Sequence, residues 1–267
     1  MESTSLSRRD ENVLEKMKDP ESNPLMAVLI DSALPRDPNI HQPSVYERVS
    51  QRERDIVVTM QQLEMQLAGL KTATPVLDPT KEYKTCVAHL GQLIAEYPQY
   101  ASARNNRAQA LRRLYGDGML LRVDDPKALA QGAQFSEKKE AAAMALSDLD
   151  EAVKLLTPKS LFSSISPQAS KTLALSHTQR AALYHITAKG LPDETDRSGL
   201  NIHEGRKEIG WSKMNFEEAA SRDFALGGRY GNEIAKGLAV ATNPTAKLCG
   251  QMVREAMKKE YGPAFEV

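Results

Sequence analysis

The stretch Tyr100–Asp117, YASARNNRAQALRRLYGD, decides the fold. Alanine and leucine recur in it at helical intervals, which predicts an amphipathic helix. A second stretch, TQRAALYHIT at residues 178–187, can be laid over its centre so that two Arg-Ala pairs coincide, each after a side-chain amide. The offset between Arg107 and Arg180 fits a helical pair that repeats at about 34 residues and is enlarged by an inserted loop.

The second helix of each expected pair carries a common spacing of a small residue, a large apolar residue and another small or medium residue. The sets are Cys86, Leu90 and Leu93 before Pro98; Ala145, Leu149 and Ala152 before Pro158; and Ala220, Phe224 and Gly227 without a following breaker. Small residues let two helices approach closely, whereas a bulky group would overpack the contact. This is the tetratricopeptide pattern of helix–turn–helix units.

The predicted fold is therefore all-α, a tetratricopeptide-type solenoid of about three helical hairpins. Scarce β-branched alternation and abundant alanine agree with this class. The expected segments are a flexible tail at 1–43 with a short apolar helix at 23–31, a repeat domain at 44–262, repeats at about 51–98, 101–158 and 171–228, and a capping helix at 243–261. Inserted loops at 118–137 and 190–212 separate the helices of the last two repeats.

The composition is that of an ordinary globular protein. Of 267 residues, 41% are hydrophobic, and 35 lysines and arginines balance 35 aspartates and glutamates. No global field therefore gathers nucleic acid or an anionic membrane. Two distant cysteines, Cys86 and Cys249, suit a reducing compartment, and the first residues lack the apolar run of a secretory signal. We expect a cytoplasmic protein, with the nucleus also open to it.

In such a solenoid the first helix of each pair lines a concave surface. Amides and guanidinium groups there can hold the backbone and the carboxylates of an extended peptide. The predicted partner-binding residues are Asn105, Asn106, Gln109, Arg112, Arg113, Gln179 and His185. We expect a protein or peptide partner in this groove, and we expect no nucleic acid, membrane, small-molecule substrate, cofactor, metal or catalytic residue.

A co-chaperone is one alternative function. Co-chaperones of this class hold the C-terminal carboxylate of heat-shock proteins with a five-residue clamp, and Asn106 followed by Arg107 matches one place of it. Residues 55–70 contain no lysine or asparagine, and Leu175 and Gln179 stand where the clamp needs lysine and arginine. A lone asparagine makes one or two hydrogen bonds of about 1 kcal/mol each, which is too little for a desolvated carboxylate.

An enzyme with a histidine-based site is the other alternative. His177 and His185 are its candidates, but they stand eight residues and so about two helical turns apart. No motif supplies a nucleophile with its base, or further ligands for a shared metal. A deep pocket with two convergent titratable groups would favour this alternative.

Several blocks resemble the tetratricopeptide repeat protein 36 family. They are NPLMAVLIDSALP, ASARNNRAQALRRLYGD, RDFALGGRYGN and NPTAKLCGQMVREAM. The resemblance covers roughly residues 20–262, and the inserted loops indicate a divergent, fungal-type member. It implies a small non-enzymatic adaptor that binds other proteins, and some family members are tied to the stability of a tyrosine-catabolic enzyme.

Overall fold

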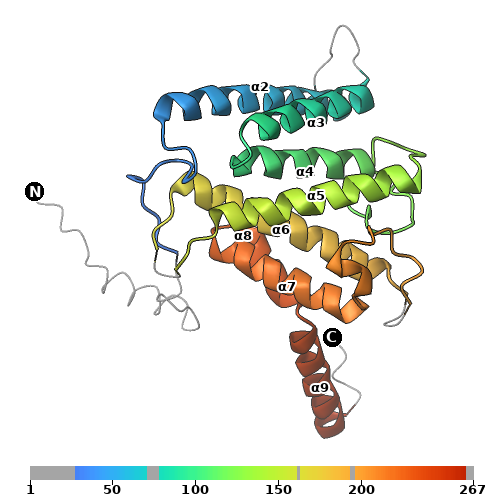
Figure 1. The fold of residues 1–267 in the computed structure, drawn as a ribbon. Coiled ribbons are helices and arrows are strands. Elements are labelled where there is room, and N and C mark those ends of the chain that lie inside the picture. Colours follow the sequence, from blue (N-terminus) through green and yellow to red (C-terminus); the bar gives the residue numbers. More distant parts are fainter. Residues whose placement is uncertain (1–27, 71–77, 161–162, 193–195, 263–267) are drawn as a thin grey trace, which may run out of the picture.

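The structure is a computed structural model that describes residues 28–70, 78–160, 163–192 and 196–262. This part of the chain contains eight α-helices, a 3₁₀ helix η2 (Lys207–Gly210) and no β-strand. The helices stack in chain order, each mainly against its neighbours in sequence (Figure 1). They are α2 (Pro43–Leu67), α3 (Pro79–Glu96), α4 (Ala101–Tyr115), α5 (Phe135–Leu156), α6 (Pro167–Gly190), α7 (Lys213–Arg229), α8 (Glu233–Thr242) and α9 (Pro244–Tyr261). The predicted all-α, solenoid-like fold is confirmed.

The helices begin where the sequence offers caps. The side chain of Asp78 caps α3, that of Ser166 caps α6, and Ser212 with Asn215 forms a capping box at α7. Proline stands in the first turn of α2, α3, α6 and α9, where a missing N–H costs nothing. Local chemistry thus fixes the starts of most helices before any tertiary packing.

Helices α2 with α3, α4 with α5, and α6 with α7 form three hairpins in this described part. Residues of the small–large–small spacing lie in their contacts: Leu90, Ala145 and Leu149 are fully buried, and Phe224 is 2% exposed. Ala108 from the opening stretch is also fully buried. Small side chains at these crossings allow close helix approach, and the large ones fill the space between neighbouring hairpins.

A repeated ion pair joins the two helices of the second and third hairpins. Arg107 on α4 donates two hydrogen bonds to Asp148 on α5, at 2.6 and 2.8 Å. Arg180 on α6 makes the same bidentate contact with Asp223 on α7, at 2.7 Å for both bonds. The arginine of the Arg-Ala motif, which reveals the repeat in the sequence, is therefore one partner of this ion pair. Its aspartate partner lies on the second helix of the hairpin.

The two inserted loops contribute to the folded body. They meet at a bridge between Leu121 and Leu200, where the N–H of Asn201 donates to the carbonyl of Leu120 at 2.7 Å. Leu120 and Leu121 are buried in the main core. Gly116 opens the first loop at a φ of 84°, a conformation that favours glycine. The loops thus tie the second hairpin to the third outside the helix stack.

Residues 28–42, which we call the strap, pack along the solenoid ahead of α2. Ile30 pairs with Ile165 in an isolated bridge, and the hydroxyl of Ser166 donates to the carbonyl of Arg36 at 3.0 Å. The helix predicted at 23–31 is therefore wrong over residues 28–31, which are extended, and its residues 23–27 lie outside the described part. The extended form lets this backbone bond to the α5–α6 connection.

The end of the stack differs from the prediction. A helix does span Pro244–Tyr261, but α8, which the sequence analysis missed, is the helix that covers α7. Gly228 permits this contact, because a Cβ there would lie 2.7 Å from the Cα of Lys236. Helix α9 instead projects from the stack below α7 (Figure 1). None of its described side chains is buried.

Candidate protein-binding groove

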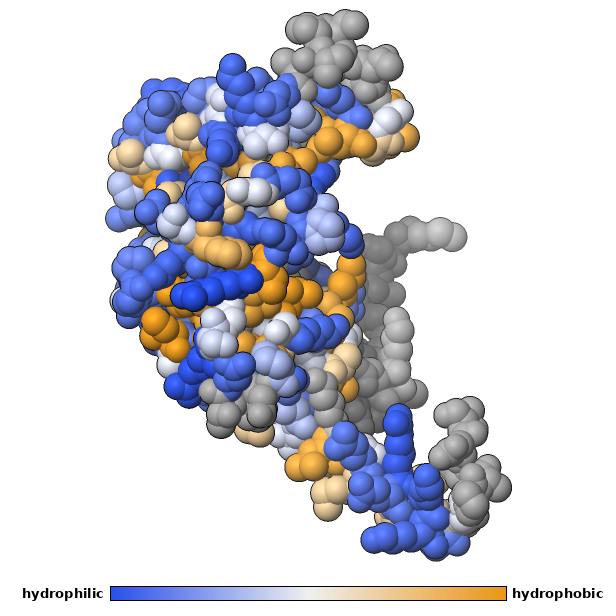
Figure 2. Space-filling view, turned by 90° about the vertical axis from the view of Figure 1, so that its right-hand side faces the viewer, coloured by the Kyte–Doolittle hydropathy of each residue, from blue (hydrophilic) through white to orange (hydrophobic). Residues whose placement is uncertain are grey.

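Helices α2, α4 and α6, the first helices of the three hairpins, line a hollow on the right-hand side of Figure 2. Two pockets of about 660 and 520 Å³ occupy this hollow, and Leu175 on α6 lines both. We call the larger one the strap pocket, because Ser32, Leu34 and Arg36 close one side of it. The smaller one is the loop pocket, because Asp125 from the first inserted loop lines it. Together they form one groove.

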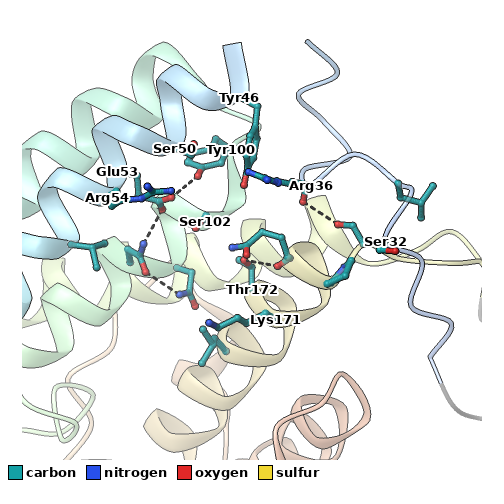
Figure 3. Close-up of a pocket in the computed structure, with 18 residues that line it drawn as sticks. Ser32, Arg36, Tyr46, Ser50, Glu53, Arg54, Tyr100, Ser102, Lys171 and Thr172 are labelled. Atoms are coloured by element: carbon teal, nitrogen blue, oxygen red, sulfur yellow. Dashed lines mark hydrogen bonds between the residues drawn. The ribbon is translucent and has the colours of Figure 1, made fainter. Parts of the chain in front are cut away.

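The inner wall of the strap pocket is built around the buried carboxylate of Glu53 on α2. The hydroxyl of Tyr100 donates to one of its oxygens, and the amide of Asn106 donates to the other at 2.8 Å (Figure 3). Burial raises the pKa of Glu53, and these hydrogen bonds only partly oppose that shift. The carboxylate therefore fastens α2 to α4 from inside the groove.

Basic side chains surround the mouth of the strap pocket. Arg54 on α2 and Lys171 on α6 are exposed and come from opposite sides of it (Figure 3). Within the described part of the chain, neither side chain makes an ion pair or a hydrogen bond. Arg36 from the strap has one exposed carboxylate neighbour, Glu47 at 3.4 Å. The mouth of the pocket thus presents positive charge that is largely without ion-pair partners in the described part of the chain.

The loop pocket differs, because both of its arginines are paired with carboxylates. Arg112 donates to Asp117 at 2.9 Å, and Arg113 donates to Glu64 at 2.7 Å. Burial alone would raise the pKa of Glu64, but the bonds from Arg113 and Tyr83 outweigh it and lower that pKa. The arginines of this half of the groove are therefore satisfied, and the exposed Lys127 is the basic side chain here that has no ion pair within the described residues.

Six of the seven predicted partner-binding residues line the groove. Asn105 and Asn106 lie in the strap pocket, and Gln109, Arg112, Arg113 and Gln179 lie in the loop pocket. Most of these side chains are already engaged. Asn105 is 3% exposed, and its side-chain oxygen accepts from Ser176 at 3.1 Å and from Gln179 at 2.8 Å.

The paired asparagines of the opening stretch therefore join α4 to both neighbouring first helices, Asn105 to α6 and Asn106 to α2. Gln109 is exposed. His185 lies elsewhere: its ring packs edge-on against Phe224 of α7, at 6.2 Å between ring centroids. The asparagine that matched the carboxylate clamp of co-chaperones is thus committed to Glu53.

Sequence reasoning missed Arg36, Glu53, Arg54 and Lys171. Lys171, Leu175 and Gln179 stand at four-residue intervals on α6, and all three line the groove. Extending the predicted groove face one turn back along α6, and across to α2, would have found Lys171 and Arg54. Arg36 had no such signal, because it belongs to the strap.

The histidine and cysteine candidates have structural surroundings. His177 is 3% exposed, and its Nδ1 lies 2.9 Å from Asp223. No cluster of three potential metal-ligating side chains occurs among the described residues. Cys86 is buried, which raises the pKa of its thiol, and it fills the small-residue place of α3.

None of the helices in the described ranges combines the length and apolarity that a bilayer crossing needs.

Comparison with known proteins gives a relative of nearly the same length. The L-tyrosine degradation gene cluster protein hmgX of Aspergillus fumigatus is 36% identical over 259 residues, which are 96% of this chain and 93% of that protein. The chain belongs to the hmgX family. Members of the tetratricopeptide repeat protein 36 group resemble this hmgX-family chain more distantly, so the predicted resemblance is confirmed.

The Homo sapiens tetratricopeptide repeat protein 36 is 28% identical over 207 residues, 78% of this chain and 76% of that protein. The Mus musculus protein of that name is 27% identical over 222 residues, 82% of this chain and 83% of its own length. No family model and no solved structure matches the hmgX-family chain. Its relatives and its helical fold together make it a tetratricopeptide-like protein.

Proposed function

We propose that this protein is a non-enzymatic adaptor that binds a segment of a partner protein in the groove formed by α2, α4 and α6. One observation carries the proposal: Arg54 and Lys171 face the strap pocket without ion pairs in the described chain, whereas the two arginines of the adjoining loop pocket are both paired. Exposed cations beside a polar hollow are suited to a ligand that brings its own anionic group.

The chemistry of the groove specifies the segment. Its acidic side chain or terminal carboxylate lies between Arg54 and Lys171. Its apolar side chains rest on Leu175, which is 39% exposed where the two pockets meet. The exposed amide of Gln109 is available to its backbone in the loop pocket. An extended acidic segment with one apolar residue meets all three requirements.

The proposed partner is an enzyme of tyrosine degradation. The name of the Aspergillus fumigatus relative places that protein in an L-tyrosine degradation gene cluster, and its similarity covers nearly the whole of this chain. Binding to the native form of such an enzyme stabilises it against unfolding by mass action. The adaptor therefore prolongs the life of its partner without taking part in the chemistry.

The test measures the affinity of the purified chain for each purified tyrosine-degrading enzyme by calorimetry. We expect one enzyme to bind, and Arg54→Glu and Lys171→Glu each to weaken that binding at least tenfold, with a reduced dependence on salt. Arg222→Glu, a matched charge reversal at an exposed position of α7 that lies in neither pocket, should bind normally. Equal weakening by Arg222→Glu, or binding by none of the enzymes, would refute the proposal.

A stability measurement separates an adaptor that protects its partner from one that only binds it. The bound enzyme should retain activity for longer at elevated temperature when wild-type chain is present, and Lys171→Glu should remove this protection. An unchanged half-life at saturating chain would exclude the protective role while leaving the binding intact.

A further inference from the structure

Helix α9 is amphipathic, yet it packs against almost nothing. Its apolar residues recur at threes and fours along one side, and its polar residues occupy the other. The apolar stripe consists of Leu248, Cys249, Met252, Val253, Ala256 and Met257. Leu248, Met252 and Val253 are 57, 62 and 57% exposed. In proteins most of the stability of a helix comes from burial of such a stripe, and in α9 that contribution is missing.

The end of the helix stack offers an open apolar surface on α8 against which a helix such as α9 fits. Helix α8 occupies the position of the first helix of a fourth hairpin and covers α7. Its side away from α7 is apolar and open, with Ile234 76% and Val240 70% exposed. In each preceding hairpin a second helix of 17 to 22 residues packs beside the first, and α9 has 18.

The connection between α8 and α9 keeps the apolar stripe of α9 away from the open side of α8 in the same chain. Asn243 alone links them, as the end of α8 and the cap of α9, with its side chain accepting from the N–H of Thr245 at 2.9 Å. Pro244 in the first turn holds Asn243 extended, at a ψ of 117°. Antiparallel helices need a connection of about two to five residues, so α9 projects away and does not fold back over its own α8.

We propose that two copies of this chain pair through an exchange of α9, each laying its apolar stripe on the open side of the other's α8. Each chain carries both an unpacked α9 and an open side of α8. In a two-fold dimer the α9 of each copy therefore covers the α8 of the other, and no apolar surface of either helix is left without a partner. A partner of another kind would cover one surface and leave the other exposed. The pair would also present two grooves, so each dimer could hold two partner segments.

The first test is the mass of the full chain in solution, by light scattering behind size exclusion at tens of micromolar. We expect twice the 29.5 kDa of one chain. Met252→Glu in the stripe should raise the dimer dissociation constant at least 100-fold, and so should Val240→Glu on α8. Gln251→Glu, the matched change on the polar side of α9, should leave the dimer intact.

Three results would overturn the proposal. One is a monomeric wild-type chain, including one that instead binds anionic vesicles through α9. Another is a dimer that survives Met252→Glu. The third is a dimer broken by Met252→Glu but not by Val240→Glu, because α9 would then pair with something other than α8.

The exposed Cys249 gives an independent readout, because it lies within the stripe. Its alkylation by a maleimide should be at least tenfold slower at concentrations where the dimer forms than after dilution. In Met252→Glu it should be fast at both concentrations. Equal rates for the wild-type chain at both concentrations would contradict burial of the stripe.

Discussion

The basic residues on the hairpin side of the first helices differ in their pairing from those at the strap pocket. Toward the second helices, Arg107 and Arg180 are each held by a buried aspartate in a bidentate contact. Toward the groove, Arg54 on α2 and Lys171 on α6 are exposed and make no ion pair within the described ranges. The fold and the proposed partner binding therefore rest on different basic residues, although all of them lie on first helices.

This contrast separates the residues that a mutation can test for binding from those that it can test only for folding. A buried charge that loses its partner is strongly destabilising, whereas an exposed unpaired charge contributes little to stability. Changes on the hairpin side should lower the free energy of unfolding, and changes at the strap pocket should leave it nearly unchanged while altering affinity.

The largest effect is expected from Asp223→Ala. It leaves the largely buried Arg180 without its main partner, and we expect a loss of about 3–5 kcal/mol in the free energy of unfolding by urea. Burial disfavours the charge of Asp223, but the bonds from Arg180 and His177 outweigh it and lower its pKa. Its stabilising contribution is therefore present above its unfolded pKa and is lost as the pH falls through the folded one. Asp150→Ala, which removes a more exposed partner of Arg180, should cost less; a reversed order would contradict the contrast.

A smaller loss should follow from Ala108→Leu beside the first of these arginines. Ala108 is fully buried, and a larger side chain overpacks its contact at a cost of about 1–3 kcal/mol. The adjacent Gln109→Leu, at an exposed position, is the control and should change stability by less than about 0.5 kcal/mol. Denaturant titration of both variants measures the difference, and a fully stable Ala108→Leu would show that the helices do not meet at this alanine.

Glu53→Gln tests a structural carboxylate that lies on the groove side of α2. Burial raises its pKa above the usual 4.5, so the folded state binds this proton more tightly than the unfolded state. The wild-type stability that comes from Glu53 is then greatest below that value and declines as the pH rises through the folded pKa. The glutamine variant lacks this decline, so at pH 7 it should equal or exceed the wild type, by up to about 1 kcal/mol. Unfolding curves at pH 4 and 7 measure this, and a constant difference between the two proteins would exclude it.

The smallest effect on stability is expected from Lys171→Gln. Its side chain is exposed and unpaired within the described ranges, so the free energy of unfolding should change by less than about 0.5 kcal/mol. The same variant should still weaken partner binding. A melting temperature that falls as far as that of Ala108→Leu would place Lys171 among the structural charges.

The sequence predicted the hairpins because their signals are local. Alanine and leucine spacing, helix caps and the repeated Arg-Ala motif all lie within single helices. The groove face of α4 was predicted for the same reason, and Asn105, Asn106 and Arg112 do line it.

What the sequence could not show is which of these side chains the protein uses itself. Asn106 bonds to Glu53 and Asn105 to Gln179, and both partners are more than 50 residues away in the chain. Such pairings depend on how hairpins stack, which no local pattern encodes. The extended conformation of the strap and the projection of α9 away from the stack were missed for a related reason, because the apolar residues of both segments fit a packed helix equally well.

The bridge between Leu121 and Leu200 has a consequence for how the molecule comes apart. Units that touch only their neighbours unravel from the ends, one after another. Here the two inserted segments interlock, and so the second and third hairpins should open as one cooperative block. The first hairpin is joined to this block more sparsely, for example by the hydrogen bond from the hydroxyl of Thr80 on α3 to the carbonyl of Leu129 at 3.2 Å. Its amides should exchange with solvent first, which makes α2, and with it half of the mouth around Arg54, the most yielding part of the groove.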